Sequence, residues 1–258
     1  MAMEGPHLRP LAASSHSVPL EAIRAGFETG ALQVVLLSLA ALPDAPSNIL
    51  TPDETARAER LVAAPVRRGF VAGRWLLRSV LAAVMGVPPG SLELRAGAHG
   101  KLFLVGHDAI APGFNLSHSG DLATVALVRG RQVGIDIEAV RPLTDAALLA
   151  RRILGPRELQ EYEKLADARR ATTLLAAWTR KEAVLKAAGT GVSGHLRSID
   201  TWSRATQDGE HTMMVRTEEP ATTWSLRTLS MPPGFHGAVA VEGEVPRLAM
   251  WQAVPVGG

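Results

Sequence analysis

Two acidic residues, Asp136 and Glu138, lie two positions apart in the β-prone run Val133–Glu138. Successive side chains of a strand point to opposite faces, so both carboxylates share one face while Ile135 and Ile137 face a core. Neighbouring carboxylates repel each other unless a positive charge lies between them. With oxygen ligands alone, a hard cation such as Mg²⁺ is the natural candidate. The competing interpretation is a half-exposed edge strand with two solvated acids.

A second group of ionisable residues lies on a helix expected over 168–188. Trp178, Glu182 and Lys186 are spaced four residues apart and fall on one stripe, with Lys181 beside them. This spacing places an acid and two bases along one helix face, next to a large aromatic side chain. The competing interpretation is an ordinary stabilising Glu–Lys pair and a tryptophan that packs in the core.

A third group ends the expected strand Phe114–His118. Ser117, His118 and Ser119, followed by Gly120, offer hydroxyls, an imidazole and turn amides to an anion. Ser117 and His118 cannot act as a nucleophile–base pair, because adjacent residues of a strand face opposite ways. An ordinary turn with polar residues would explain the same pattern.

Lys101, which precedes the expected strand Leu102–Val105, adds a weaker fourth signal. Together the four groups suggest a site for a polyphosphate ligand, with carboxylates for a metal and with lysine, histidine and serine for phosphate. The sequence has no G-x-x-x-x-G-K-[ST] loop, which disfavours a P-loop kinase.

The elements that must position these residues mix helices and strands without regular βαβ alternation, which predicts an α+β fold. The run Thr51–Glu54 has the pattern of a capping box with proline at the first helical position, and it opens a helix that Pro65 ends. Further helices are expected over 66–85, 157–165 and 168–188, and strands over 32–39, 102–105, 114–118, 123–128, 133–138, 199–203, 212–216, 223–229 and 237–241.

A faint internal repeat divides the chain. The segment Ser79–Ala83 resembles Ala183–Ala187, and both lie near the ends of long expected helices. Chance similarity between helices rich in alanine and valine explains this pattern equally well. We expect two related halves, 1–130 and 131–258.

The composition excludes several classes of protein. The 258 residues include 27 Lys and Arg against 25 Asp and Glu, and a net charge of +2 does not indicate nucleic-acid binding. The chain has no cysteine, which excludes disulfide scaffolds, thiolate zinc sites, iron–sulfur clusters and cysteine nucleophiles. Residues 1–20 look poorly ordered and carry no secretory signal, and no apolar stretch is long enough to span a bilayer. We therefore expect a cytoplasmic protein without a membrane partner.

The chain resembles the 4′-phosphopantetheinyl transferases of the surfactin-synthetase-activating (Sfp) type over about residues 30–245. The resemblance is carried by three motifs in the family's order: F-N-x-S-H-S, [IV]-G-I-D-I-E and W-[ST]-x-K-E-A-x-x-K-A-x-G-x-G. It implies a pseudodimer of two similar α+β halves with the active site between them. It also implies transfer of the 4′-phosphopantetheine arm of coenzyme A to a serine of an apo carrier protein, with release of 3′,5′-ADP. Such an enzyme has holo-acyl-carrier-protein synthase activity.

The resemblance further implies roles for individual residues. Asp136, Glu138 and Glu182 would hold Mg²⁺ against the pyrophosphate of coenzyme A. Lys181 and Lys186 would contact phosphate oxygens.

At the nucleotide end of coenzyme A, the resemblance places His118 at the 3′-phosphate, with Ser117 nearby. Lys101 matches the lysine of the family's G-K-P motif, although Leu102 replaces the proline. The remaining matches are two basic residues near the nucleotide and one acid sometimes placed near the metal: Arg67, Arg68 and Glu158.

The acceptor serine must lose a proton, either to Glu182, directly or through a metal-bound water, or to Lys186. Two other functions fit the same residues: a Mg²⁺-dependent phosphohydrolase, and a noncatalytic module that binds coenzyme A or a carrier protein. Carrier proteins of fatty-acid, polyketide and nonribosomal-peptide synthesis all fit this expectation. We expect a monomer on which the carrier docks at the loop Gly189–Val192 and near Lys101.

Overall fold

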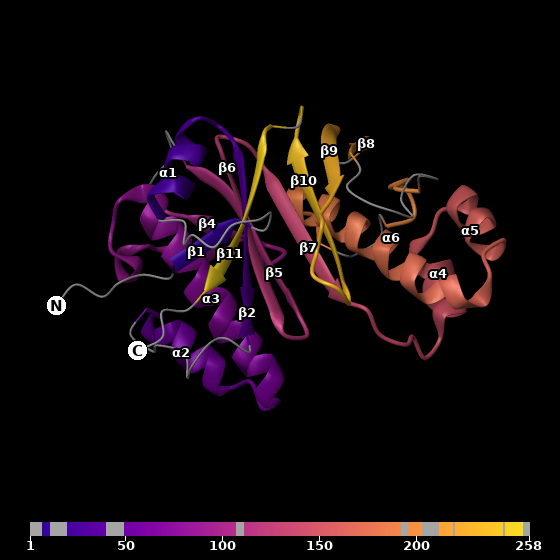
Figure 1. The fold of residues 1–258 in the computed structure, drawn as a ribbon, viewed down its shortest axis with the longest axis horizontal. Helices are drawn as coiled ribbons and strands as arrows, with labels where there is room; N and C mark the ends of the chain where they lie inside the picture. Colours follow the sequence, from indigo (N-terminus) through magenta and orange to yellow (C-terminus); the bar gives the residue numbers. More distant parts are fainter. Residues whose placement is uncertain are drawn as a thin grey trace. The chain divides into compact units, whose positions relative to one another are not determined.

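The computed structural model describes residues 7–10, 20–39, 49–106, 111–191, 196–202, 212–218, 220–244 and 246–254. The chain forms two compact units (Figure 1). Unit 1 comprises Met1–Gly97, Leu102–Arg131 and Pro246–Gly258, and unit 2 comprises Ala98–Lys101 and Gln132–Val245. No helix within the described ranges is long and apolar enough to cross a membrane.

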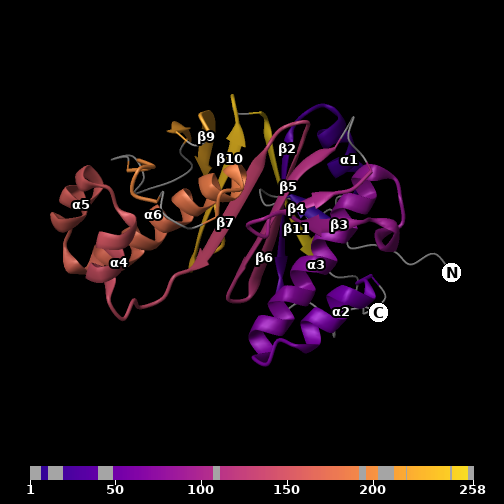
Figure 2. The same ribbon diagram turned by 180° about the vertical axis from the view of Figure 1, so that it is seen from behind.

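Unit 1 contains a five-stranded sheet in the order β1-β11-β2-β6-β5. Strand β11 runs parallel to β2, and the other pairs are antiparallel. The strands are β1 (His7–Pro10), β2 (Leu32–Ser38), β5 (Pro112–Ser119), β6 (Leu122–Arg129) and β11 (Leu248–Val254). Helices α1 (Leu20–Glu28) and α3 (Ala64–Met85) pack on this sheet (Figure 2). The remaining elements are α2 (Pro52–Glu59), a 3₁₀ turn at Pro89–Ser91, and the hairpin of β3 (Leu94–Ala96) and β4 (Leu102–Leu104).

The helices of unit 1 follow local signals in the sequence. The expected capping box at the start of α2 is confirmed: Glu54 N–H donates to Thr51 Oγ1 at 3.3 Å, and Thr51 N–H donates to Glu54 Oε2 at 3.1 Å. The sequence predicted that Pro65 ends this helix, but the helix already ends at Glu59. Pro65 lies instead in the first turn of α3, where the missing N–H of proline would have had no partner anyway. Gly86 ends α3 in the left-handed conformation, with φ of 69°.

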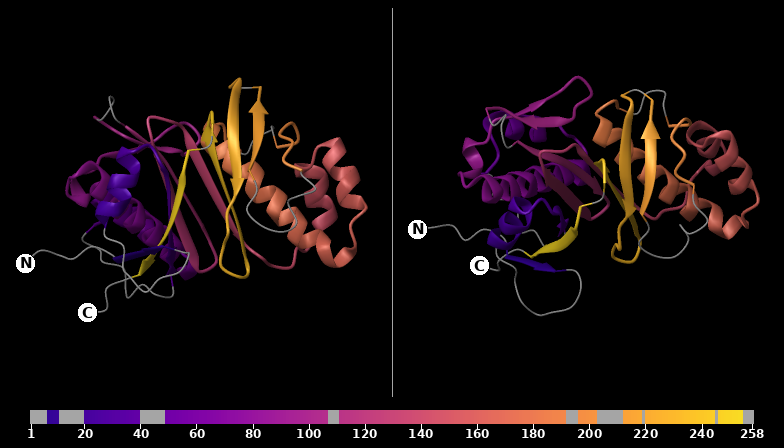
Figure 3. Two further views of the ribbon diagram at one scale, coloured as in Figure 1. Left: turned by 45° about the horizontal axis from the view of Figure 1, so that its top comes forward. Right: turned by 90° about the horizontal axis from the view of Figure 1, so that it is seen from above.

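Unit 2 contains a four-stranded antiparallel sheet in the order β7-β10-β9-β8. Its strands are β7 (Val133–Ala139), β8 (Thr212–Thr217), β9 (Thr222–Thr228) and β10 (Phe235–Glu242). Helix α6 packs on this sheet, and α4 and α5 pack on α6 (Figure 3). These helices are α4 (Ala146–Ile153), α5 (Pro156–Glu163) and α6 (Asp167–Ala188). Helix α4 was not expected from the sequence, and the strand expected at 199–203 is not formed over the described residues 199–202.

The two units repeat one connectivity. In unit 1, β2 is followed by α3 and then by β5 and β6, and β6 lies between β2 and β5 in the sheet. In unit 2, β7 is followed by α6 and then by β9 and β10, and β10 lies between β7 and β9. Helices α3 and α6 both have 22 residues and both end at a left-handed glycine. The mixed α+β class is confirmed.

The place of the last strand, β11, disagrees with the expected division of the chain at residue 130. Strand β11 pairs with β2 of unit 1, and Trp251 Nε1 donates to Oε1 of the fully buried Gln33 at 2.8 Å. The chain from Pro246 onward therefore belongs to unit 1 rather than to a second half that runs over 131–258.

Candidate active site

Strand β7 lies directly under helix α6, and a glycine makes this possible. A Cβ atom at Gly134 would lie 2.1 Å from the backbone nitrogen of Ala187 and 2.2 Å from the carbonyl oxygen of Ala183. Any side chain at this position would push the helix off the strand. Because side chains alternate along a strand, Asp136 and Glu138 project from the same face as Gly134, toward α6.

The acidic face of β7 is therefore the face that α6 covers. The sequence predicted a core under Ile135 and Ile137, and both are buried, but Asp136 is buried too, at 4% exposure. Lys186 of α6 forms an ion pair with Asp136, with 2.7 Å between Nζ and Oδ1. The interpretation as an exposed edge strand with solvated acids is thus wrong at Asp136.

Glu182 of α6 is the second buried acid of this cluster, at 6% exposure. Burial and the negative charge of Asp136 raise the pKa of Glu182 to about 7; Glu138 adds to the rise and Lys186 opposes it. No hydrogen-bond partner within the described ranges faces its buried Oε1. A carboxyl group with a pKa near 7 can exchange a proton at neutral pH.

Glu138 lies at the more accessible end of the acidic face. Its Oε2 accepts a hydrogen bond of 3.0 Å from Arg141 Nη1. Across the sheet, Glu138 is paired in register with His236 of β10. Burial lowers the pKa of His236, and the charge of Arg180 lowers it further, so both act against protonation of the neighbouring imidazole.

The residue types of this cluster fit a magnesium ion. Asp136, Glu138 and Glu182 offer only carboxylate oxygens, which are the ligands that Mg²⁺ prefers. Lys186 pairs with only one of these acids, and burial together with the charge of Asp136 raises the pKa of Glu182. In the ranges that the structure describes, no three acidic or histidine side chains are gathered in the geometry of a metal site.

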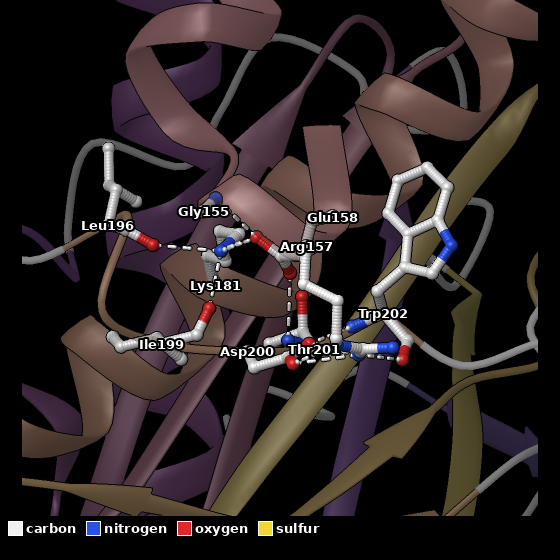
Figure 4. Close-up of polar contacts among 9 residues, drawn as sticks. All are labelled: Gly155, Arg157, Glu158, Lys181, Leu196, Ile199, Asp200, Thr201 and Trp202. Carbon is white, nitrogen blue, oxygen red and sulfur yellow. Dashed lines mark hydrogen bonds and ion pairs between the residues drawn. The ribbon is translucent and has the colours of Figure 1, made fainter. Parts of the chain in front are cut away.

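Lys181 does not face this cluster, although it precedes Glu182 in the chain. It is fully buried and donates to Glu158 Oε2 at 2.6 Å and to the carbonyl oxygens of Leu196 and Ile199 (Figure 4). Successive residues of a helix are about 100° apart, so Lys181 points to another side of α6. The expected phosphate contact of Lys181 and the expected place of Glu158 near the metal therefore both differ from the structure.

Lys101 also has partners other than the expected ones. Its ammonium group donates to the carbonyl oxygen of Ala187 at 2.7 Å and to Gln132 Oε1 at 2.8 Å. Burial lowers the pKa of Lys101 to about 8, while the charge of Glu242 acts in the opposite direction. Lys101 thus satisfies a carbonyl group at the C-terminal end of α6, where a cation is favoured by the helix dipole.

Comparison with known proteins places this arrangement in a family. The family model of the 4′-phosphopantetheinyl transferase superfamily matches residues 132–240. The chain is 38% identical over 197 residues to the 4′-phosphopantetheinyl transferase HetI of Nostoc sp., covering 75% of this chain and 79% of that protein. The chain belongs to the 4′-phosphopantetheinyl transferase superfamily.

More distant relatives carry the same name. The 4′-phosphopantetheinyl transferase psf-1 of Bacillus pumilus is 29% identical over 187 residues, which cover 72% of this chain and 76% of that protein. The 4′-phosphopantetheinyl transferase AcpT of Escherichia coli is 33% identical over 141 residues, covering 53% and 65%. The region matched by the family model contains the acidic face of β7 and all of α6.

Of the residues expected at the nucleotide end, Lys101 lies in unit 2, and the others lie in unit 1: Arg67, Arg68, Ser117 and His118. His118 is exposed at the end of β5, and its Nδ1 would lie 3.1 Å from a Cβ atom at Gly69 of α3. Arg67 and Arg68 precede this glycine and are exposed, and Arg68 Nη2 donates to the carbonyl oxygen of Leu39 at 2.6 Å. Unit 1 thus brings His118 beside the first turns of α3.

Two other expectations concern the ends of β5 and α6. Ser117 is buried where His118 is exposed, which agrees with the inference that they cannot pair as nucleophile and base. Of the expected docking loop, Gly191 packs against the side chain of His99, whereas Val192 lies outside the described residues.

Sequence reasoning missed two glycines that permit close backbone contacts in unit 2. Gly134 permits the contact of α6 with β7, and Gly155 permits a close approach of Arg197, whose carbonyl oxygen would lie 2.7 Å from a Cβ atom at residue 155. A glycine inside a strand is a recognised sign of close backbone approach. That signal was present in the Val-Gly-Ile-Asp-Ile-Glu motif, beside the acids that drew attention.

Proposed function

We propose that this chain transfers the 4′-phosphopantetheine arm of coenzyme A to a serine hydroxyl of an apo carrier protein. The bond from phosphorus to 3′,5′-ADP breaks, a bond to the serine Oγ forms, and the serine proton passes to a base on the enzyme. The observation that carries the proposal is Glu182, whose pKa of about 7 results from burial beside Asp136. Membership of the transferase superfamily supports the same reaction.

Glu182 is the proposed base, because its pKa allows it to accept a proton at neutral pH and to release it afterwards. Lys186 is the alternative, but its ammonium group already donates to Asp136 Oδ1 at 2.7 Å. Lys186 instead offers positive charge to the phosphate oxygens on which negative charge builds.

We further propose that the reaction depends on Mg²⁺ held by Asp136, Glu138 and Glu182. When bound there, the ion would supply charge neutralisation for the pyrophosphate of coenzyme A. In unit 1, His118, Ser117, Arg67 and Arg68 are proposed to receive the nucleotide end. The repeated connectivity of the two units supports the expectation of a pseudodimer of related halves.

The partners in this proposal are coenzyme A and an apo carrier protein of fatty-acid, polyketide or nonribosomal-peptide synthesis. We propose that the enzyme acts as a monomer in the cytoplasm, with neither nucleic acid nor membrane as a partner.

The decisive experiment is incubation with coenzyme A, Mg²⁺ and an apo carrier protein, followed by intact mass measurement of the carrier. We expect a gain of one phosphopantetheine arm. Asp136→Ala and Glu182→Gln should abolish this gain, because each removes one carboxylate of the cluster, while Tm shows that both variants remain folded.

Cleavage of coenzyme A without modification of the carrier would indicate a phosphohydrolase instead. Binding of coenzyme A without turnover would indicate a noncatalytic module.

A further inference from the structure

Lys181 and Glu158 form a buried ion pair that has no part in the transfer step proposed above. Lys181 is 0% exposed and Glu158 is 1% exposed, and 2.6 Å separates Nζ from Oε2. Burying two charges is costly unless each has a partner and further hydrogen bonds satisfy the remaining atoms. The surroundings of both side chains meet this condition.

The ammonium group of Lys181 is fully used. It donates to Glu158 Oε2, to the carbonyl oxygen of Leu196 at 2.8 Å and to the carbonyl oxygen of Ile199 (Figure 4). An ammonium group has three protons, so none remains for a phosphate oxygen of a substrate.

The carboxylate of Glu158 connects three parts of unit 2. Its Oε2 also accepts from Gly155 N–H at 2.8 Å, at the start of α5, and its Oε1 accepts from Thr201 N–H at 2.9 Å. Through Lys181 it reaches α6. The segment 196–202, the first turn of α5 and helix α6 therefore meet at one carboxylate (Figure 4).

A second ion pair ties the same segment to α5 from outside. Arg157 Nε and Nη2 donate to the two carboxylate oxygens of Asp200 at 2.7 Å each, and Nη2 also donates to the carbonyl oxygen of Trp202 at 2.9 Å (Figure 4). The side chains of Arg157 and Asp200 are 60% and 50% exposed, so this pair contributes little stability. This pair links the segment to α5, whereas Lys181 links the segment to α6.

Helix α6 is thus held on two sides. The contact with Gly134 fixes the distance of α6 from β7. The bonds of Lys181 fix which side of α6 faces α5 and the segment 196–202. A helix anchored at two points around its axis cannot rotate without breaking one of them. Glu182 follows Lys181 directly, so any rotation at Lys181 would turn Glu182 away from Asp136.

We propose that Lys181 and Glu158 are positioning residues, which fix the rotation of α6 and so direct Glu182 and Lys186 at Asp136 without contacting the substrate. Only the activity readout of this inference rests on the proposed function. The stability readout depends on the ion pair alone.

A double-mutant cycle of Lys181→Met, Glu158→Gln and the two combined tests the proposal. Lys181→Met leaves an uncompensated buried carboxylate, and we expect Tm to fall by roughly 6–20 °C. We expect kcat to fall on the order of 10²-fold through misplacement of Glu182, with the KM for coenzyme A unchanged. In the double variant neither side chain is charged, so much of the loss in Tm should be regained, whereas kcat should stay low with an unchanged KM for coenzyme A, because the link that fixes the rotation of α6 is still absent.

Lys164→Met is the matched control, because Lys164 pairs with Glu161 on the surface of α5 and is 68% exposed. This variant should leave both Tm and kcat near their wild-type values. If the double variant regains Tm but keeps a low kcat and a raised KM for coenzyme A, Lys181 contacts the substrate and the proposal is wrong. If the double variant regains a wild-type kcat, the pair does not fix the rotation of α6 and the proposal is also wrong. Inactivity of the wild-type enzyme would instead defeat the proposed function, and the Tm cycle would still decide whether the pair anchors α6.

Discussion

Glu182 ionises near neutral pH because the fold buries it beside a second acid. Its pKa in the folded protein is about 7, against 4.5 without the structure. Lys186 is shared between the two acids: it pairs directly with Asp136 and acts on Glu182 only through its charge. The cluster therefore holds one readily exchangeable proton, at Glu182, whose buried Oε1 meets no hydrogen-bond partner among the described residues.

The pH dependence of stability should report this proton. A carboxyl group whose pKa is raised by folding gives its full contribution to stability below pH 4.5 and loses it as the pH rises through about 7. The loss corresponds to about 3 kcal/mol. Glu182→Gln cannot ionise, so in EDTA the Tm of the wild type should fall relative to this variant over that pH range. Thermal melts at several pH values measure the effect, and a gap between the two proteins that does not change with pH would contradict it.

His118 should determine whether the enzyme recognises the 3′-phosphate of coenzyme A. It is exposed at the end of β5, where an imidazole can reach a ligand. Loss of a hydrogen bond to a charged group costs about 1.5–3 kcal/mol. His118→Ala should therefore weaken the binding of coenzyme A more than that of dephospho-coenzyme A, as measured by calorimetry. Dephospho-coenzyme A is the control, and equal losses for the two ligands would remove His118 from this role.

At the scale of elements, the contact between β7 and α6 determines the spacing of the acidic cluster. Gly134→Ala should lower Tm and the rate of transfer together, because the new methyl group would meet helix backbone rather than a flexible side chain. We expect a loss of roughly 1–3 kcal/mol in stability. Gly90→Ala is the matched control, since a Cβ atom there meets nothing within 4 Å. Near-wild-type stability of Gly134→Ala would mean that α6 does not lie on this glycine.

The sequence predicted β7 and α6 because their patterns of residue types are local. Periodicity placed Asp136 and Glu138 on one face of a strand, and the spacing of Glu182 and Lys186 placed both on one helix stripe. The partners of Lys181 were not predictable in the same way. They lie 15, 18 and 23 residues away, and two of them are backbone carbonyl groups, which have no sequence signature.

At the scale of the whole molecule, the repeat is one of connectivity, and the chain departs from it at its C-terminal end. Units 1 and 2 each place a 22-residue helix after the first strand of a β-α-β-β series. The sheet of unit 1 also contains β11, which follows unit 2 in the sequence and lies between β1 and β2 in the sheet. From the sequence no strand was expected over 248–254, and strand propensity does not reveal which sheet such a strand joins.

Removal of the residues after Glu244 should therefore destabilise unit 1 and leave unit 2 largely intact. Without β11, the interior strand β2 becomes a sheet edge, and the buried amide of Gln33 loses its bond to Trp251. Hydrogen exchange is the suitable measurement, because it reports each strand separately. The amides of β2 should exchange faster in the truncated chain than in the full chain, while those of β10, which pairs with β7 and β9, should keep their protection. Equal acceleration in β2 and β10 would show that the two units unfold together, and unchanged protection in β2 would show that β11 does not stabilise the sheet.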